Sequence, residues 1–526
     1  MKKLVSTLLL LSAATAVSAQ WSEDPAVNNR ITPSNVGFYE PTVRTNSDGV
    51  TYYFYLAPTI LANGNDAFQH RMQIYTAEGK RVYGAAGKIL TQERNITWTK
   101  YCDYTVLDND GNCLVAAYDL RDSDPAKYDF NYYIYKIAPT GEQLWGPVAL
   151  NNGQADANTL FLRMCATDDG GTAYVYCTSS ADGKYRVTQL ERLDKDGHPL
   201  WQQPVVIEPE SETTRPFVVN NGENEVMVIY QDATGEFVAR VFDAQGNDVW
   251  KESIVLYSGG FSSQYVFPSI DVQAGPGGGV IFCVMNGAYD GLIVYLTRDG
   301  QYGFPDGNYG TRVPGPDYQS TVPNVCYQPE EQAFYVAFNN MAYYGYDGYG
   351  VSVQKFSLEG EPLWGDNGVE ILPTQPNQQV STPTMRLAPD GRMAVLYQYM
   401  EGNTSTAPVS SYIAIVDKDG QVVVEPQDFS TTLNVKKNFS VSPLIGGNHY
   451  IASWTERRTG STSECIYSQY VNALDGSTTN GIETIATTDD RQADALWTLD
   501  GNRHQQPAKG LNIVRRGGKT TKFINK

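Results

Sequence analysis

The sequence predicts an all-β protein, a β-propeller of about eight four-stranded blades. Three observations predict this fold. A glycine turn recurs along the chain, short apolar segments end at such turns, and no sustained 3.6-residue periodicity of the kind that marks helices is present. Repetition of one supersecondary unit at a spacing of several tens of residues is typical of propellers and solenoids, and a β-solenoid would need shorter periods.

The recurring turn is Asp-Gly, Glu-Gly, Gln-Gly or Thr-Gly, followed by Trp or another apolar residue. Its clearest copies run from the glycine to a Trp, at Gly141 to Trp145, Gly197 to Trp201, Gly246 to Trp250 and Gly360 to Trp364. Weaker copies centre on Gly79, Gly300, Gly420 and Gly476. Successive glycines are 49 to 62 residues apart, so the chain contains eight such units.

Each unit has the same internal order of segments. An apolar segment leads to a tight turn such as Asn109-Asp110-Gly111, and a second apolar segment follows, such as 393–397. After a loop of variable length comes a third segment, such as 185–190, then the glycine turn and the Trp-bearing fourth segment. A string of separate β-sandwiches is the main alternative, but one unit is small for a self-sufficient core.

The segment from Trp21 to Ile31 resembles a fourth strand, because its apolar residues echo those that follow Trp364. We expect this segment to close the ring onto the final blade. A strand over Ile482–Ile485 would compete for the same edge, so seven blades remain an alternative to eight.

The first 19 residues have the features of a secretory signal peptide. Lys2 and Lys3 precede an apolar run over 4–11, and small residues end at Ala19. The run is too short to span a bilayer, no later stretch approaches the ~20 apolar residues of a spanning helix, and position 20 is not a lipid-accepting cysteine. The sequence therefore predicts a protein that is secreted or held on the outer cell surface, with the periplasm as an alternative.

The charge distribution excludes broad binding to nucleic acid or to an anionic membrane. The net charge is -19, whereas both partners need a cationic surface. From Gly501 onward the chain has seven Lys or Arg residues and no acidic residue, so basic charge collects only at the end.

Two segments resemble known families. The run 355–360, with Trp364-Gly365-Asp366-Asn367-Gly368-Val369 after it, is similar to the delta-60 repeat of secreted bacterial proteins, and this resemblance supports a propeller-like fold. The end of the chain, with 497–503, 509–514 and a Lys-rich terminus, resembles the C-terminal sorting signal of the type IX secretion system of Bacteroidetes. The second resemblance implies that the secretion machinery is a partner of this tail; an ordinary basic β-hairpin is the alternative. The predicted domains are a signal peptide (1–19), the propeller (20–488) and the tail (489–526).

Aromatic residues are the candidate ligand contacts. In the predicted blade, short glycine turns gather on one face of the disc, and variable loops and crossovers gather on the other, where function usually lies. Flat rings with a polar edge suit sugars or peptides. The candidates from these loops and crossovers are Trp98, Tyr128, Tyr132, Tyr265, Tyr318, Tyr343, Tyr344 and Tyr346. Packing of these rings on the protein itself is the alternative.

Other chemistry has little support. Four histidines, His70, His198, His449 and His504, form no convincing triad or metal site. Three turns that begin at Asp108, Asp194 and Asp417 start like calcium loops but place glycine at the wrong position, so hairpin turns are the simpler interpretation. We predict no catalytic residue, metal or cofactor.

The seven cysteines are an odd number, and several lie in apolar runs, so we expect most to be buried thiols. One or two disulfides, from the neighbouring pairs Cys102 with Cys113 or Cys165 with Cys177, are the alternative.

The leading functional hypothesis is a non-enzymatic propeller that binds a glycan, peptide or protein through its long loops. A propeller hydrolase or lyase that acts on polysaccharide with paired carboxylates is the second hypothesis. A purely structural envelope protein is the third.

Overall fold

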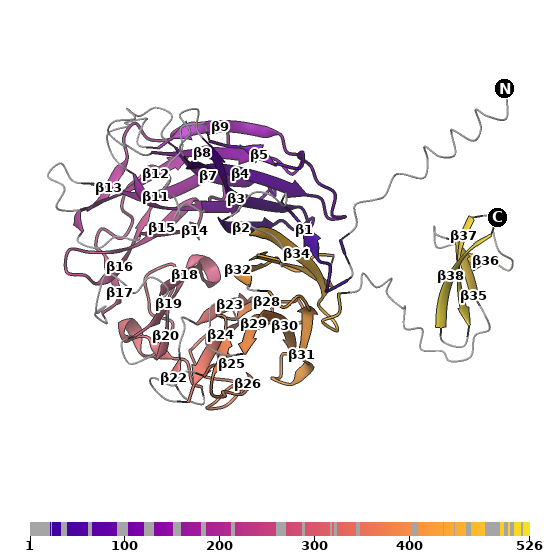
Figure 1. Cartoon of the computed structure of the whole chain (residues 1–526). Helices are drawn as coiled ribbons and strands as arrows, with labels where there is room; N and C mark the ends of the chain where they lie inside the picture. The colour runs from indigo at the N-terminus through magenta and orange to yellow at the C-terminus, as the bar shows by residue number, and fades with distance from the viewer. Residues whose placement is uncertain are drawn as a thin grey trace, which may run out of the picture. The chain divides into compact units, whose positions relative to one another are not determined.

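In a computed structural model of the chain, the predicted strands form eight antiparallel sheets that succeed one another around a ring (Figure 1). The chain divides into two compact units, residues 1–479 and 480–526, and each is described by itself. The structure describes residues 21–22, 24–32, 39–60, 66–91, 104–119, 131–150, 159–179, 186–211, 216–258, 270–286, 290–315, 318–319, 323–342, 348–401, 409–434, 436–446, 448–458, 464–478, 495–498, 503–504, 510–516 and 519–525. The predicted signal peptide, the competing segment 482–485 and the predicted boundary between 488 and 489 lie outside these residues.

The first four blades each contain four strands in sequence order. Blade 1 consists of β2 (Tyr39–Thr45), β3 (Thr51–Ile60), β4 (Asp66–Tyr75) and β5 (Lys88–Ile89). Blade 2 consists of β6 (Tyr104–Leu107), β7 (Cys113–Asp119), β8 (Asn131–Ile137) and β9 (Gln143–Ala149). Blade 3 consists of β10 (Leu160–Ala166), β11 (Thr172–Ser179), β12 (Arg186–Leu193) and β13 (Val205–Ser211). Blade 4 consists of β14 (Phe217–Gly222), β15 (Glu225–Gln231), β16 (Phe237–Phe242) and β17 (Ile254–Tyr257).

Blades 5 to 8 add short elements to the same plan. Blade 5 consists of β18 (Ile270–Ala274), β19 (Val280–Met285), β20 (Gly291–Leu296) and β21 (Thr311–Arg312), with the 3-10 turns η3 (Pro276–Gly278) and η4 (Gly307–Tyr309). Blade 6 consists of β23 (Asn324–Gln328), β24 (Ala333–Met341), β25 (Gly350–Ser357) and β26 (Val369–Leu372), and β22 (Tyr318–Gln319) pairs with the far end of β24. Blade 7 consists of β28 (Thr384–Leu387), β29 (Met393–Glu401), β30 (Val409–Val416) and β31 (Val422–Ser430), and β27 (Gln378–Val380) extends it in the same way. Blade 8 consists of β32 (Lys436–Val441), β33 (His449–Glu456), β34 (Cys465–Asn472) and β1 (Asn29–Arg30).

The turns are built as the sequence pattern predicts. Between β2 and β3, the Asn46 side chain accepts hydrogen bonds from the backbone N–H groups of Asp48 (3.1 Å) and Val50 (2.9 Å). Gly49 completes the turn at φ 80°, a left-handed conformation that glycine adopts without a steric penalty. The same turn recurs in other blades and sets the register of their hairpins.

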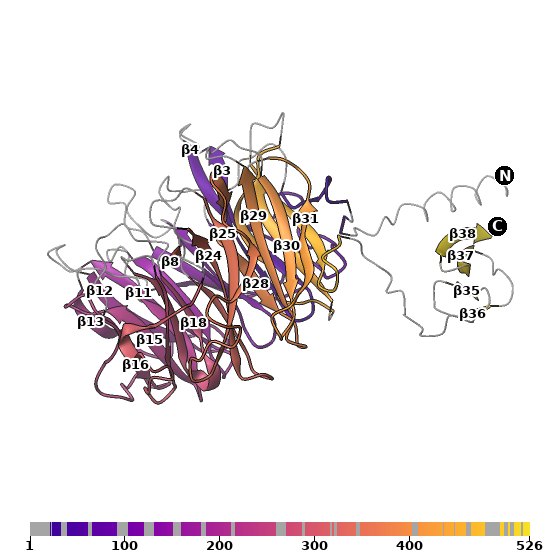
Figure 2. The ribbon, with the colours of Figure 1, turned by 90° about the horizontal axis from the view of Figure 1, so that it is seen from below.

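Neighbouring blades stack with their sheets face to face (Figure 2), and the core consists of the layers of side chains between them. Side chains of a strand alternate between its two faces. Tyr52 and Phe54 therefore pack toward blade 2, whereas Tyr53 and Tyr55 pack toward blade 8. Among the described residues, buried apolar side chains form eight clusters, one at each blade junction, including the junction between blades 8 and 1. These clusters show that the ring has eight blades and is closed.

The N-terminal segment closes the ring, as predicted. Asn29 and Arg30 of β1 pair antiparallel with Ser468 and Tyr467 of β34, and Figure 1 shows β34 beside β1 and β2. The last blade is therefore built from both ends of the propeller sequence. The closed ring takes eight blades and not seven.

The second unit contains one four-stranded antiparallel sheet. Its strands are β35 (Ala495–Thr498), β36 (Arg503–His504), β37 (Gly510–Arg516) and β38 (Lys519–Asn525), in the order β36-β35-β37-β38. The described residues of both units include no helix that is long and apolar enough to cross a membrane.

Candidate functional site

The two ends of the strands form different faces of the propeller. Connections between first and second strands and between third and fourth strands lie at one end, which we call the turn face. Connections between second and third strands, and crossovers to the next blade, lie at the other end, which we call the loop face. This division is the one that the sequence predicts.

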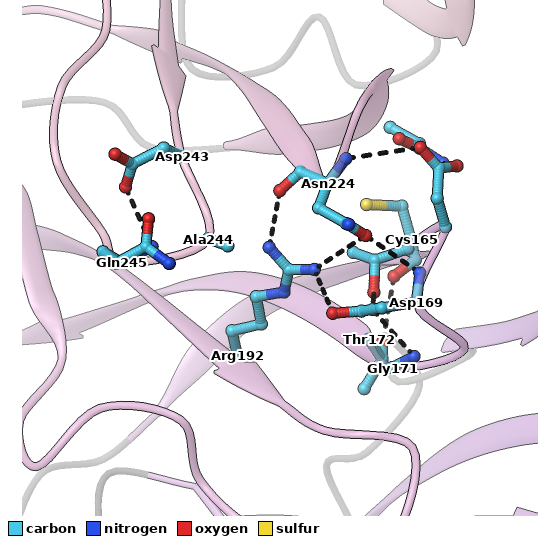
Figure 3. Close-up of polar contacts among 12 residues, drawn as sticks. Cys165, Asp169, Gly171, Thr172, Arg192, Asn224, Asp243, Ala244 and Gln245 are labelled. Carbon is cyan, nitrogen blue, oxygen red and sulfur yellow. Dashed lines mark hydrogen bonds and ion pairs between the residues drawn. The ribbon is translucent and has the colours of Figure 1, made fainter.

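Charged groups on the turn face are used by the protein itself. The Arg192 side chain at the end of β12 is 0% exposed and pairs with Asp169 at 2.8 Å. Its guanidinium also donates to the backbone carbonyl of Asn224 in blade 4, at 2.6 Å (Figure 3). Asp169 accepts two more hydrogen bonds, from Thr167 (2.6 Å) and Gly171 (3.1 Å), and these interactions hold the pKa of its carboxyl low despite burial. Arg192 thus joins blades 3 and 4 through its two terminal guanidinium nitrogens.

The same use of cations recurs in other blades. Lys136 pairs with Asp108 at 2.7 Å, and its ammonium donates to the carbonyl of Gly170 in the next blade at 3.3 Å. Lys355 pairs with Glu331 and donates to the carbonyl of Lys418 in the next blade at 3.0 Å. These cations at the turn face therefore stabilise contacts between neighbouring blades.

The glycine-to-Trp repeat joins each blade to the next. The Trp145 indole N–H donates to the carbonyl of Lys195 at 2.9 Å, and Trp201 donates to Ala244 at 3.0 Å. Each ring covers the turn glycine of the following blade, so that a Cβ atom on Gly197 would lie 2.7 Å from the Trp145 ring. We call the side chain that contacts the glycine turn of the next blade the latch residue. A glycine is needed at this turn for its φ of 85° and for the close approach of the latch residue.

Blades without the Trp use another latch residue, which sequence reasoning missed. The Tyr83 hydroxyl donates to the carbonyl of Gly141 at 2.6 Å, Phe304 contacts Gly360, and the Gln427 side chain donates to Asp475. Tyr83 and Phe304 stand four residues after their turn glycines, as the Trp residues do. The shared spacing, rather than residue type, was the available signal.

Trp21 completes the series at ring closure. Its indole N–H donates to the carbonyl of Ala77 in blade 1 at 3.0 Å. The ring stacks against Tyr75, with centroids 5.5 Å apart, and against Tyr470 of blade 8, at 6.4 Å. The N-terminal segment therefore supplies both the fourth strand and the latch residue of blade 8.

The three calcium-like sequences are hairpin turns, as predicted. In each, the first Asp accepts hydrogen bonds from backbone N–H groups two and four residues later, for example from Asp196 and His198 to Asp194, both at 2.9 Å. Asp108 and Asp417 do the same. In the part of the chain that the structure describes, no group of three or more His, Cys, Asp or Glu residues could hold a metal ion.

One predicted ligand contact is wrong. Tyr132 is the second residue of β8, which is buried along its whole length; it is 2% exposed and packs in the cluster between blades 2 and 3. Its side chain points into the blade junction because strand residues alternate between neighbouring blades. Tyr318 lies in β22, and its side chain is not described. The remaining candidates lie outside the described residues and stay predictions: Trp98, Tyr128, Tyr265, Tyr343, Tyr344 and Tyr346.

The described histidines of the propeller do not come together. His70 is buried in blade 1, stacks on Phe54 with centroids 5.3 Å apart, and has a pKa lowered to about 3 by burial. His198 lies in an exposed turn of blade 3, next to Asp194 at 3.3 Å, and His449 stacks on Tyr470 in blade 8. His70 stacks on Phe54 at the junction between blades 1 and 2, whereas His449 stacks on Tyr470 at the junction between blades 8 and 1, so the two do not form a catalytic pair.

The six described cysteines are free thiols. Cys165 faces Ala173, and Cys177 faces Leu160, so this pair is not bonded across its hairpin. Burial raises the pKa of Cys113 and Cys165 to about 12, which leaves both thiols protonated and unreactive. Cys102 lies outside the described residues. The expectation that most cysteines are buried thiols is confirmed for the described ones.

The junction between blades 7 and 8 holds a group of buried and partly buried charges at the loop face. We call Asp428, Lys436, Glu456 and Arg458 the seam cluster. Glu456 is fully buried and accepts hydrogen bonds from Asn434 at 2.7 Å and from the Trp454 indole at 2.9 Å. Glu456 and Arg458 also form an ion pair at 3.5 Å.

Arg458 links the seam cluster to the closing segment. Its guanidinium donates to the carbonyl of Val27 at 2.8 Å and to the side chain of Asn28 at 2.7 Å, and lies 3.9 Å from the centre of the Tyr467 ring. Asn28 in turn donates to Gln469 at 2.9 Å. The cluster therefore fixes the N-terminal segment against blade 8.

Lys436 and Asp428 are the perturbed groups of the seam cluster. The Lys436 ammonium is buried and donates to the carbonyls of Val409 and Thr432. Burial lowers its pKa to about 8, although the carboxylates of Glu456 and Asp428 oppose this change. Burial raises the pKa of Asp428 in the same junction. Asp428 is partly buried, and a carboxyl with a raised pKa is the type of group that acts as a general acid, which bears on the hydrolase hypothesis.

Blade 5 presents exposed aromatic rings on the outer rim. Tyr309 in η4 is 74% exposed, and Tyr302 is 39% exposed. The Asp306 side chain between them is also exposed. Arg312 of β21 pairs with Asp290 at 2.8 Å nearby in the same blade. We call Tyr302, Asp306, Tyr309 and Arg312 the rim strip.

Comparison with models of protein families gives no match, and no curated protein matches the sequence. Several solved structures are similar in outline. An ulvan lyase of polysaccharide lyase family 25 shares 11% identity, with 86% of this chain and 97% of that chain covered and a TM-score of 0.41. A lectin from Burkholderia pseudomallei shares 12% identity, with coverage of 75% and 99% and a TM-score of 0.44. An α-L-arabinanase from Penicillium chrysogenum, solved with arabinobiose, shares 14% identity, with coverage of 63% and 98% and a TM-score of 0.33. At these identities and TM-scores, the similarities support no conclusion about ligand or activity.

Sequence reasoning missed both the seam cluster and the rim strip. Lys436 and Glu456 are partners in the β32–β33 pairing of blade 8, and Arg458 follows β33, whereas Asp428 of β31 joins them because blade 7 packs against blade 8. For the rim strip a local signal existed, because Gly307-Asn308-Tyr309-Gly310 is a short glycine-bounded insertion that carries an aromatic residue.

Proposed function

We propose that this protein is a non-enzymatic propeller that binds a glycan, a peptide or a protein through its loop face. The observation that carries the proposal is the contrast between the two faces. On the turn face, buried cations such as Arg192 and Lys136 are bonded to their own and the neighbouring blade. The loop face is the surface left for a partner, and loops on a rigid scaffold are where binding residues concentrate.

An array screen of the chain from residue 20 onward tests this proposal. We expect a saturable hit on a glycan or peptide array, and we expect the triple variant Tyr343→Ala, Tyr344→Ala, Tyr346→Ala to lose it. The matched control is Tyr132→Phe, a conservative change in the buried cluster between blades 2 and 3, which should leave binding unchanged. No hit for either protein would favour the structural envelope role, and a hit that the triple variant keeps would remove those tyrosines from the site.

A polysaccharide hydrolase or lyase is the second candidate, and the seam cluster favours it. Asp428 has a raised pKa and shares its junction with Lys436, whose pKa is lowered. Such opposed shifts accompany acid and base roles in enzymes. Turnover of a polysaccharide panel that Asp428→Asn abolishes, with unchanged thermal stability, would establish this candidate in place of the first.

We further propose that the protein is exported and reaches the outer surface through its C-terminal unit. The sequence features of 1–19 and the resemblance of the tail to a type IX sorting signal support this route. The test is fractionation of cells that express the full chain and a chain that ends at residue 488. Retention of only the shortened chain in the periplasm is the expected result, and equal export of both would exclude the tail as a sorting signal.

A further inference from the structure

Blade 5 contains an insertion that the fold does not need. Six residues, 305–310, separate the latch residue Phe304 from β21, whereas four residues, 365–368, separate Trp364 from β26 in blade 6. Phe304 already fills the junction between blades 5 and 6, where it is buried. The insertion therefore adds a segment beyond the residue that joins blade 5 to blade 6.

The insertion presents an aromatic ring to solvent. At 74%, Tyr309 is the most exposed large hydrophobic side chain among the described residues. A side chain so exposed contributes little to the stability of the core. Display of the ring, rather than packing, is what the insertion achieves.

Hydrogen bonds hold the insertion in place. The Tyr309 N–H donates to the carbonyl of Asp306, and the Gly310 N–H donates to Gly307, both at 3.2 Å. Asn308 is fixed to blade 4, since its side-chain amide donates to the Ser258 hydroxyl at 2.7 Å and its carbonyl accepts from the Ser258 N–H at 3.2 Å. A ring on a fixed backbone binds with a smaller loss of conformational entropy than one on a free loop.

A second ring and polar groups extend the surface along the rim. The Tyr302 hydroxyl donates to the carbonyl of Val255, which fixes its ring, and a Cβ atom on Gly307 would lie 3.6 Å from that ring. The exposed Asp306 carboxylate and the Arg312 guanidinium, which Asp290 partly neutralises, lie in the same insertion and strand. The rim strip thus combines flat apolar faces with hydrogen-bonding groups of both signs.

We propose that the rim strip is a binding site for a saccharide chain, with one sugar ring stacked on Tyr309. A sugar presents a flat array of C–H groups to an aromatic face and hydroxyls to flanking carboxylate and guanidinium groups. All four residues of the strip are exposed, which suits an extended polysaccharide. Addition of a peptide strand is disfavoured because β21, the edge strand here, has two residues. This inference rests on the glycan class named in the proposed function, but it places the site on a different surface. An experiment can therefore contradict one proposal without contradicting the other.

Native gel electrophoresis of the chain from residue 20 onward, in gels cast with soluble xylan, arabinan, galactomannan or β-glucan, tests the site. At least one polysaccharide should retard the protein. Tyr309→Ala should weaken that retardation about tenfold, the effect expected for one stacked ring. Tyr309→Phe, the matched control that keeps the ring, should stay within about twofold of the parent. Because Tyr309 is exposed, circular dichroism should show unchanged folding of both variants.

Two further arms separate this site from its alternatives. The triple variant at Tyr343, Tyr344 and Tyr346 should keep the Tyr309-dependent retardation, even if those tyrosines prove essential on the loop face. Decaproline, tested by titration calorimetry, should not bind. The proposal is overturned if no polysaccharide retards the parent, if Tyr309→Ala behaves like the parent, or if decaproline binds in a Tyr309-dependent manner.

Discussion

The indole nitrogen of Trp145 in blade 2 lies 2.9 Å from the backbone carbonyl oxygen of Lys195 in blade 3. The ring also covers Gly197, two residues further along the same turn. Equivalent contacts follow at most blade junctions, with Trp201 on Ala244 and with Trp21 on Ala77 at the closure. Adjacent blades are thus joined at their outer edges as well as through their buried clusters.

Trp145→Ala should lower the free energy of unfolding by about 2 kcal/mol, because it removes a large half-buried ring and a hydrogen bond to the next blade. Trp145→Phe keeps part of the ring and should lose about half as much. Chemical denaturation followed by fluorescence measures both. Equal stability of the parent and Trp145→Ala would show that the latch residue has no energetic role.

Gly197→Ala should also destabilise the protein, by about 1 to 2 kcal/mol, since the backbone has a positive φ and the new methyl group meets the Trp145 ring. In the Trp145→Ala background the steric part of this loss should disappear. A double-mutant cycle measures the coupling. Strict additivity of the two changes would contradict the contact.

The pKa of Lys436, lowered to about 8 from 10.5, makes the stability depend on pH. Between pH 8 and 10 the unfolded lysine keeps its proton while the folded one releases it, so stability should rise with pH over this window. The full effect of this one group is about 3 kcal/mol. Above pH 10 the trend should reverse, because burial raises the pKa of tyrosines such as Tyr53 above the unfolded value of 10.0.

Lys436→Met isolates this contribution. The unfolding free energy of the parent, relative to that of Lys436→Met, should increase from pH 7 to pH 10. Denaturation curves at four pH values provide the measurement. A difference that does not vary with pH would mean that the folded lysine titrates normally.

The six described thiols should resist alkylation in the native protein. Burial raises the pKa of Cys113 and Cys165 to about 12, and Cys283 shows the same effect. Iodoacetamide treatment with and without denaturant, followed by peptide mass spectrometry, should label these six residues only after unfolding. Rapid native labelling of Cys113 would contradict its burial.

Removal of residues 20–32 should open the ring. This change deletes β1, the Trp21 latch residue and the Asn28 contacts with Arg458 and Gln469. Loss of a cooperative unfolding transition is the expected result, with Trp21→Ala giving a smaller decrease in midpoint. A shortened chain with the parent's melting temperature would show that closure does not depend on this segment.

Much of the fold is predictable from the sequence because each repeat has the same glycine turn followed by the same type of strand. The glycine-to-Trp spacing predicted the blade number and the fourth strands. The echo of Trp364 at Trp21 gave the closure. Phe304 escaped notice because a different residue type occupies the same position. The prediction for Tyr132 was wrong because the residue lies just beyond a loop, inside β8. Side chains of that strand alternate between the two neighbouring blades, so Tyr132 faces a blade junction and not the solvent.

The functional surface is less predictable for a physical reason. The seam cluster contains residues of β31, β32 and the end of β33 and contacts Asn28. It depends on the packing of blade 7 against blade 8, and the contact with Asn28 depends on ring closure. Tyrosine is common in this chain, so composition does not distinguish Tyr309, which is exposed, from Tyr132, which is buried. Exposure depends on which blade a side chain faces, and this follows from tertiary packing.

Closure by β1 has a consequence for the order of events during synthesis. Asn29 is made near the start and must wait for Ser468, its partner, which is made hundreds of residues later. Until then the nascent chain is an open arc in which β34 lacks its edge partner and the apolar face of blade 1 is uncovered, and such surfaces invite association with other chains. The ring is thus completed late, and the interval before closure is when the polypeptide most needs protection from its own copies.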